Sequence, residues 1–222
     1  MAAAEQLSDL AAALAELASA ASRIKVTVSA QHSRQFERYI STLLWWRERV
    51  SLITAATPLA IVRFHIVDAL AVAPFVEPGA RVADLGSGAG FPGIPLAIVR
   101  PDATFVLVES RRKKANFLRE ALRRADIANA DVAESRAESV AGEFDMVVSR
   151  AVWPLQHFLD VAERLLRPEG TAIAMKGPGA LQQEVVGGVG FPKAEIVRYQ
   201  LHGGIQRLLF VFRRRSGSPR FT

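Results

Sequence analysis

Three glycines at alternate positions, Gly86, Gly88 and Gly90, are the residues whose spacing points most directly to chemistry. Because glycine has no Cβ, such a stretch lets the backbone turn sharply and approach a ligand closely. An apolar run at residues 80–84 predicts a strand before the turn, and the pattern of residues 93–99 predicts a helix after it. A glycine-rich turn between a strand and a helix is typical of sites that bind nucleotides or nucleotide-like cofactors.

Two acidic residues help to choose the cofactor. Residues 88–93 match the dinucleotide fingerprint G-x-G-x-x-G, and Glu109, about twenty residues further on, suits contact with a ribose in any nucleotide-like ligand. Asp84, however, precedes the first glycine and would bring negative charge to the place of a pyrophosphate. A cationic ligand such as S-adenosylmethionine (SAM) fits that charge better. The turn therefore favours SAM, and a dinucleotide cofactor or a turn without a ligand are the alternatives.

The composition excludes several other kinds of site. The 222 residues include no cysteine and four widely spaced histidines, so disulfides, a catalytic thiol and thiolate zinc sites are excluded and no metal site is expected. The first twenty residues form an amphipathic pattern with acids and lack the basic start of a signal peptide. No apolar run approaches the ~18 residues of a membrane-spanning helix. We expect a cytoplasmic, monomeric protein that does not enter a membrane.

Basic residues cluster in two places. The net charge is +6, and the last ten residues hold four arginines and no acid: Arg213, Arg214, Arg215 and Arg220. A second cluster has Glu120 as its one local acid and comprises Arg111, Arg112, Lys113, Lys114, Arg119, Arg123 and Arg124. Since each Lys or Arg placed on a phosphate releases counterions, this distribution favours a nucleic-acid partner over a merely solvated surface.

The order of the expected elements predicts the fold class. Helices are expected first, at residues 4–21, 31–50 and 59–72. Short apolar runs then alternate with helical patterns: the runs cover residues 80–84, 104–109, 131–133, 145–149 and 171–175, and the helices cover residues 93–99, 113–125, 154–166 and 180–186. Such alternation predicts an α/β, doubly wound fold with a mostly parallel sheet. Runs at residues 194–201 and 207–212 predict a closing antiparallel hairpin.

These elements divide the chain into three parts. We expect an N-terminal helical cap over residues 1–78, packed on a core over residues 79–213. A basic tail, residues 214–222, follows the core.

Several separated motifs together resemble one protein family. They are Gly-Phe-Pro-Gly-Ile-Pro at residues 90–95, Glu109-Ser110 with Lys113-Lys114, Arg136-Ala137-Glu138, Ser149-Arg150-Ala151 and Met175-Lys176-Gly177. In this order they resemble the RsmG (GidB) family, bacterial methyltransferases that act on N7 of a guanine in 16S rRNA. The resemblance covers residues 46–212. It implies a Rossmann-like class I SAM-dependent methyltransferase fold, with 16S rRNA as partner, within the small ribosomal subunit or its precursor.

The resemblance also implies which residues bind SAM. The family's cofactor contacts fall on Gly86, Phe91, Ala137, Glu138 and Arg150. Three further positions, Asp84, Gly88 and Glu109, belong to the general pattern of SAM-dependent methyltransferases.

Four basic residues are candidates to position the substrate. Arg150 and Lys176 follow expected strands, at the edge of the sheet where such folds bind ligands. Lys113 opens the helix after Glu109, and Arg207 matches a basic position in the family's last hairpin. Guanine N7 carries a lone pair and no proton, so in-line methyl transfer to it requires orientation rather than a general base.

The chain departs from the family in two segments of the cap. Ser51-Leu52-Ile53-Thr54 stands where the family has Asn-Leu-Thr, and residues 64–69 stand where it has Arg-His-x-x-Asp-Ser. Phe64 replaces the arginine, and Arg63 is a candidate to substitute for it. His65 and Asp68 are expected on one helix face, within hydrogen-bonding reach.

The sequence leaves three alternative hypotheses for the function of the protein. They are a methyltransferase for a small molecule or protein, a nucleotide-dependent oxidoreductase, and an RNA-binding protein without catalysis.

Overall fold

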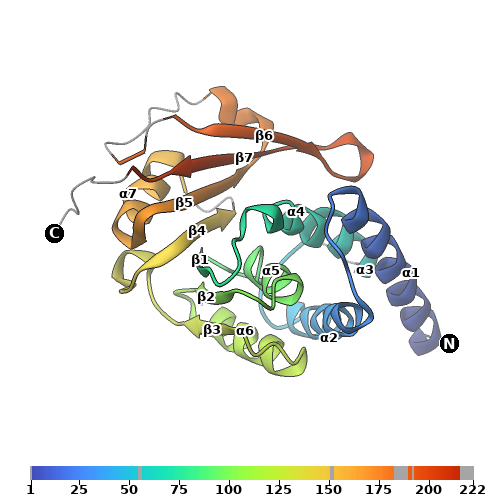
Figure 1. Cartoon of the computed structure of the whole chain (residues 1–222). Coiled ribbons are helices and arrows are strands. Elements are labelled where there is room, and N and C mark those ends of the chain that lie inside the picture. The colour runs from blue at the N-terminus through green and yellow to red at the C-terminus, as the bar shows by residue number, and fades with distance from the viewer. Residues whose placement is uncertain (1, 55–56, 151–152, 183–189, 192, 216–222) are drawn as a thin grey trace.

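The computed structural model describes residues 2–54, 57–150, 153–182, 190–191 and 193–215, and this part of the chain contains one seven-stranded sheet (Figure 1). Its strand order is β3-β2-β1-β4-β5-β7-β6. The strands are β1 (Arg81–Leu85), β2 (Thr104–Val108), β3 (Ala130–Ala133), β4 (Phe144–Arg150), β5 (Leu166–Lys176), β6 (Glu195–Gln200) and β7 (Gln206–Arg213). The first five strands are parallel, and β7 pairs antiparallel with β5 and β6. The expected α/β fold with an antiparallel C-terminal hairpin is therefore confirmed.

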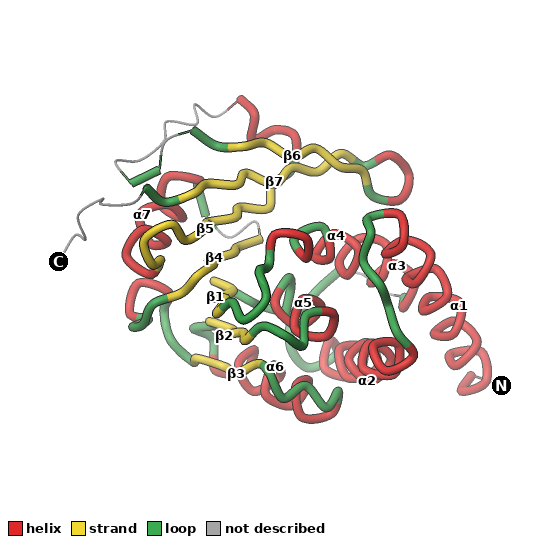
Figure 2. Tube along the Cα trace, in the orientation of Figure 1, coloured by secondary structure: helices red, strands yellow, loops and turns green. Residues whose placement is uncertain are grey.

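Helices cover both faces of this sheet (Figure 2). Successive strand residues point to opposite faces, so Val82 of β1 belongs to one apolar cluster while Ala83 belongs to another. The first cluster includes buried side chains of α5 (Gly93–Val99) and α6 (Arg112–Arg124), and the second those of α7 (Leu155–Leu165). Because both faces are buried, the inner strands β1 and β4 are mostly apolar, as is usual in parallel sheets, with polar residues such as Asp84 and Arg150 near their carboxyl ends.

The cap is helical, and it joins the first apolar cluster of the core. It contains α1 (Ala2–Arg23), α2 (Ala30–Arg47), α3 (Pro58–Ile61), a π-helix (Val62–Ile66), α4 (Val67–Leu70) and a 3-10 turn (Ala73–Phe75). The Thr57 hydroxyl accepts a hydrogen bond from the Ala60 amide, 3.2 Å away, and so caps the N-terminus of α3. The single helix expected over residues 59–72 is instead interrupted by the π-helix.

One expectation about apolar length requires correction. The stretch Pro58–Phe75 is 18 residues long with a mean hydropathy of 1.5, enough by length and composition to cross a membrane. Half of it is buried inside the protein, however, where Ile61, Val62 and Ile66 contribute to the apolar cluster shared with the core. This segment is apolar because it forms the centre of the cap.

Two elements near the C-terminus differ from expectation. The helix expected at residues 180–186 corresponds to a 3-10 helix, Pro178–Gln182, and residues 183–186 lie outside the described part. Strand β5 begins at Leu166 rather than residue 171, directly after α7, and its pairing with β4 shifts register between Phe144 and Met146. At the start of the expected tail, Arg214 is buried and its guanidinium donates to the Leu166 carbonyl; residues 216–222 are outside the described part.

Candidate active site

The glycine turn is held to β2 by its backbone. The amides of Gly86 and Ser87 both donate to the Val108 carbonyl, at 2.9 and 3.0 Å. Gly88 has a φ of +58°, a left-handed conformation that side chains disfavour. Its amide donates to Glu109 Oε2 at 3.1 Å, and Arg111 donates its amide to Glu109 Oε1 at 2.7 Å. Glu109 thus fixes the turn and the start of α6, and it also lines a cavity.

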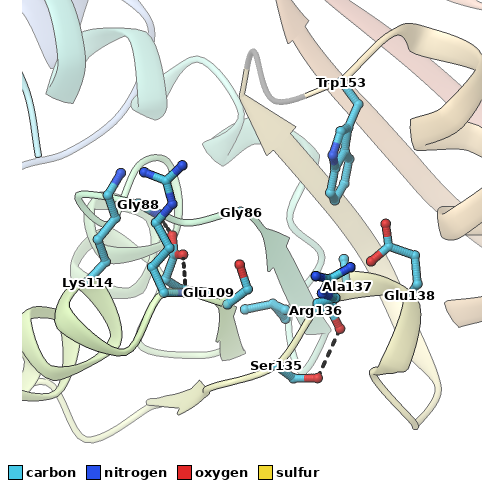
Figure 3. A pocket seen from close by; sticks show the side chains of 12 residues that line it. Gly86, Gly88, Glu109, Lys114, Ser135, Arg136, Ala137, Glu138 and Trp153 are labelled. Carbon is cyan, nitrogen blue, oxygen red and sulfur yellow. Dashed lines mark hydrogen bonds between the residues drawn. The ribbon is translucent and has the colours of Figure 1, made fainter.

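That cavity has a volume of about 410 Å³ and lies at the ends of β1 and β2 (Figure 3). It brings together five of the residues expected to bind the cofactor: Gly86, Gly88, Glu109, Ala137 and Glu138. Trp153 projects toward it from the opposite side (Figure 3). Its volume falls in the usual range for sites of small organic ligands, about 300–1,000 Å³. We call it the first cavity.

Asp84 lies under the turn and is not among the residues that line the first cavity. Its carboxylate is fully buried, and Oδ2 accepts a hydrogen bond from the Gly93 amide at 3.0 Å. Among the described residues, Oδ1 has no hydrogen-bond partner. Burial raises the pKa of Asp84 to about 6, against the opposing effect of the Gly93 hydrogen bond. A Cβ on Gly93 would lie 2.7 Å from Oδ2, so only glycine allows this close approach.

Phe91 and Arg150, the other two expected cofactor residues, are not among the residues that line the first cavity; they pack against each other beside the turn. The buried Phe91 ring stacks on His65, with centroids 5.1 Å apart and planes at 23°. The Arg150 guanidinium carbon lies 4.7 Å from the Phe91 centroid. Tyr39 of α2 meets the same ring edge-on at 5.8 Å, and its hydroxyl donates to the Ala89 carbonyl at 2.6 Å. The cap therefore contacts the glycine turn directly.

A second cavity, of about 380 Å³, lies at the ends of β4 and β5, against the cap. It unites three of the four substrate candidates, Arg150, Lys176 and Arg207, with three cap residues, Phe64, His65 and Asp68. Lys113 does not join them, because it is exposed on α6. It is Lys114 that lines the first cavity.

Asp68 is the centre of a buried polar network behind the second cavity. Its Oδ1 accepts from the Tyr199 hydroxyl at 2.7 Å and lies 3.8 Å from Arg207 Nε, while Oδ2 accepts from Arg150 Nη1 at 3.3 Å. His65 Nδ1 lies 3.2 Å from the same Arg150 nitrogen. His65 and Asp68 therefore contact the same nitrogen of Arg150, which links the two side chains. Burial, reinforced by the two arginines, lowers the pKa of His65 to about 4, so its ring is neutral near pH 7.

Two connections were not visible in the sequence. The Lys176 ammonium donates a hydrogen bond to the Trp153 carbonyl, and burial lowers the pKa of Lys176. Since Trp153 lines the first cavity and Lys176 the second, this bond joins their walls. Arg63 does not replace the arginine at position 64: it forms a two-pronged ion pair with Glu16 of α1, at 2.6 and 2.7 Å.

Both cavities lie where the sheet topology places ligands. The strand order reverses between β1 and β4, and ligands of open α/β sheets bind beyond the carboxyl ends of the strands at such a reversal. The glycine turn follows β1, Glu109 follows β2, and Arg150 and Lys176 end β4 and β5. No cluster of three or more metal-ligating side chains occurs within the described ranges.

A protein-family comparison identifies this arrangement. The sequence model of the family described as "rRNA small subunit methyltransferase G" (GidB) matches residues 32–189, most of the chain. The chain belongs to this family. The match includes the glycine turn, Glu109, Ala137, Glu138, Arg150 and Lys176, and it confirms the resemblance drawn from the motifs.

Curated relatives carry the same family name. A "Ribosomal RNA small subunit methyltransferase G" from Xanthomonas axonopodis pv. citri is 46% identical over 142 residues, which cover 63% of this chain and 66% of the relative. One from Xanthomonas oryzae pv. oryzae is 41% identical over 168 residues, 75% of this chain and 79% of the relative. The matched region is thus just under two thirds of the first relative's length.

Solved structures confirm the fold class. Thermus thermophilus TrmN aligns with a TM-score of 0.55 and 21% identity over 80% of this chain and 52% of its own. M. jannaschii TYW2, solved in complex with AdoMet, aligns with a TM-score of 0.55 and 16% identity over 68% of this chain and 76% of its own. At these identities the likeness is one of fold, that of class I SAM-dependent methyltransferases.

Proposed function

We propose that this protein transfers the methyl group of SAM to N7 of a guanine in 16S rRNA. The observation that carries the proposal is the pair of adjoining cavities, one framed by the glycine turn and Glu109, the other by Arg150, Lys176 and Arg207. Their common wall contains Trp153 and Lys176. The family assignment supports rRNA as the methyl acceptor.

The described residues fit SAM as the ligand of the first cavity. Glu109 has free lone pairs for ribose hydroxyls, and the turn at Gly86 and Gly88 presents backbone without side chains. Ala137 and Glu138 form the opposite rim. Oδ1 of buried Asp84, which has no hydrogen-bond partner among the described residues, supplies negative charge under the turn, and this suits a cationic ligand. SAM supplies an electrophilic methyl group on a positively charged sulfur when it is bound.

The residues of the second cavity have an orienting task. Guanine N7 presents a lone pair and no proton, so methylation needs alignment at attack distance and no general base. In this proposal Arg150, Lys176 and Arg207, which line this cavity, hold the RNA there, and the exposed Lys113 contacts it outside the cavity. The neutral His65 ring adds no positive charge beside a base that becomes cationic.

The substrate in this proposal is 16S rRNA within the small ribosomal subunit or its precursor. The protein then acts in the bacterial cytoplasm, as a monomer. The basic residues on and near α6 support a polyanionic partner, although Glu120 binds two of them, Arg123 and Arg124.

The test is methyl transfer from labelled SAM to small subunits purified from a strain that lacks this protein. Large subunits serve as the control, and mass spectrometry of digested rRNA identifies the modified nucleoside. We expect label in small subunits as 7-methylguanosine. Label at another atom would refute the N7 assignment. Label confined to a small molecule or a protein would establish the alternative substrate class instead.

A further inference from the structure

The second cavity has an unbalanced charge. Of the described residues that line it, Arg150, Lys176 and Arg207 are cationic and Asp68 alone is acidic. His65 is neutral near pH 7, because burial beside two arginines lowers its pKa to about 4. One acid thus faces three cations, and two positive charges are left without a carboxylate in the cavity.

Depth separates the acid from the cations. The Asp68 side chain is 5% exposed, whereas that of Arg207 is 32% exposed and that of Arg150 19%. The carboxylate lies behind, and its two oxygens are occupied by Tyr199, Arg150 and Arg207. An incoming ligand would therefore meet the guanidinium groups rather than the acid.

The network draws its members from separate elements. Asp68 lies on α4 of the cap, Arg150 ends β4, Tyr199 lies on β6 and Arg207 on β7. Tyr199 is held neutral, since burial and the neighbouring Asp68 raise its pKa far above the usual range, so its hydroxyl keeps the proton that it donates. A buried carboxylate that bonds three side chains from three strands fixes their relative positions.

We propose that the second cavity binds a backbone phosphate next to the target guanosine, through Arg207 and Lys176, and that Asp68, fixed by Tyr199, is the positioning residue for Arg207 and Arg150. This inference deepens the proposed function and rests on it. Guanidinium groups are well suited to phosphate because their planar donors match its oxygens. Phe64 adds an apolar cap side chain to this wall, and Arg207 is more exposed than Arg150, so its guanidinium is the more accessible of the two.

The first experiment measures binding of the protein, loaded with S-adenosylhomocysteine (SAH), to small ribosomal subunits over a range of salt concentrations. Arg207→Gln removes one cation from the cavity. Its control, Arg213→Gln, removes the same charge from the other end of the same strand, where Arg213 is exposed. We expect Arg207→Gln to weaken binding about tenfold and to reduce the slope of log affinity against log salt by about one. Equal effects of the two variants would overturn the phosphate assignment.

The second experiment separates positioning from folding. For Asp68→Asn and Tyr199→Phe we expect a several-fold higher KM for small subunits, with melting temperature and SAH affinity close to wild type for Tyr199→Phe. If the role were only structural, SAH affinity and melting temperature would fall together with activity in both variants, and the positioning role would be refuted.

A third arm distinguishes the sources of the phosphate and separates this inference from the proposed function. Guanosine 5′-monophosphate and inorganic phosphate are offered as competitors of small-subunit binding, and the nucleotide also as a methyl acceptor. We expect weak competition by both in wild type, none in Arg207→Gln, and no methylation of the free nucleotide. Methylation of the free nucleotide would overturn RNA as the source. Since binding is measured without methyl transfer, a missing 7-methylguanosine product would refute the proposed function while leaving the phosphate measurement intact.

Discussion

Asp84 is a carboxylate in an apolar interior, and its environment explains what the glycine turn is built around. One oxygen bonds the Gly93 amide and the other has no partner in the described part of the protein. Such burial disfavours the ionised form, which is why the pKa of Asp84 is raised to about 6. A cationic ligand above the turn would offset this cost, and the proposed SAM site places one there.

The raised pKa predicts a pH dependence of stability without ligand. Asp84 ionises near its ordinary pKa of 3.8 in the unfolded chain but near about 6 in the folded protein. Its contribution to the free energy of unfolding is therefore most favourable at low pH, and this contribution is lost as the pH rises from about 4 to about 6. Asp84→Asn removes the effect. Urea unfolding from about pH 4 to about pH 7 should show the variant gaining about 2 kcal/mol relative to wild type; parallel curves would contradict the assignment.

Gly93 is required by contact with its neighbours. A Cβ at this position would lie 2.2 Å from Leu107 Cδ2 and 2.7 Å from Asp84 Oδ2. Gly93→Ala should therefore lower the free energy of unfolding by about 1–3 kcal/mol and weaken SAM binding, because the start of α5 must move. Gly179→Ala is the control, since no atom of the described residues lies within 4 Å of a Cβ there. Calorimetry of SAM binding and urea unfolding of both variants test this requirement for glycine. If the two variants gave indistinguishable results, the requirement for glycine at position 93 would be refuted.

At the scale of elements, the sequence predicted the strands of the core and the glycine turn well. Parallel strands are apolar runs and their turns carry glycine, so local pattern suffices. It missed the π-helix Val62–Ile66, because its apolar residues have ordinary helical spacing. The sequence also predicted that β5 starts at residue 171, because Arg167, Pro168 and Glu169 are polar or proline residues that are unusual in strands. In the structure these residues belong to β5.

The residues of the candidate site were predictable from the sequence, whereas the long-range contacts that hold them were not. Gly86, Gly88 and Glu109 adjoin the turn and do line the first cavity. Tyr199 bonds Asp68 from 131 positions away, and Tyr39 bonds Ala89 from 50 positions away. No local pattern encodes such contacts, because they arise only when the cap and the hairpin pack on the sheet.

Helix α2 links the cap to the glycine turn through Tyr39, and the variant Tyr39→Phe tests whether this contact supports the turn. The fully buried hydroxyl donates to the Ala89 carbonyl at 2.6 Å. Its removal leaves a buried carbonyl unsatisfied, so we expect a loss of about 1–2 kcal/mol in the free energy of unfolding, together with weaker SAH binding. Trp45→Phe is the control on the same helix, because Trp45 is half exposed. Unchanged SAH affinity in Tyr39→Phe would show that α2 does not support the turn.

In the whole molecule, the cap and the core share one apolar interior. The first cluster joins Leu17 of α1 and Ile40 of α2 with Ile94, Phe105 and Phe117 of the core. The hairpin adds a polar contact, because His202 lies 3.7 Å from Glu16 of α1, across the turn that reaches the cap in Figure 2. A cap attached in this way cannot leave without exposing the face of the sheet that it covers.

Cap and core should therefore unfold in a single transition. The protein has three tryptophans, and in Trp153→Phe the remaining two, Trp45 and Trp46, lie on α2 of the cap. They report on the cap and on its contact with the core, because Trp46 meets Phe117 of α6 edge-on at 6.0 Å. Their fluorescence and the far-ultraviolet circular dichroism of the whole chain should then give the same urea midpoint, as cooperative single domains do. An earlier fluorescence midpoint would mean that the cap opens by itself. The glycine turn would then lose the Tyr39 contact before the sheet unfolds, and the cap would be a separate unit.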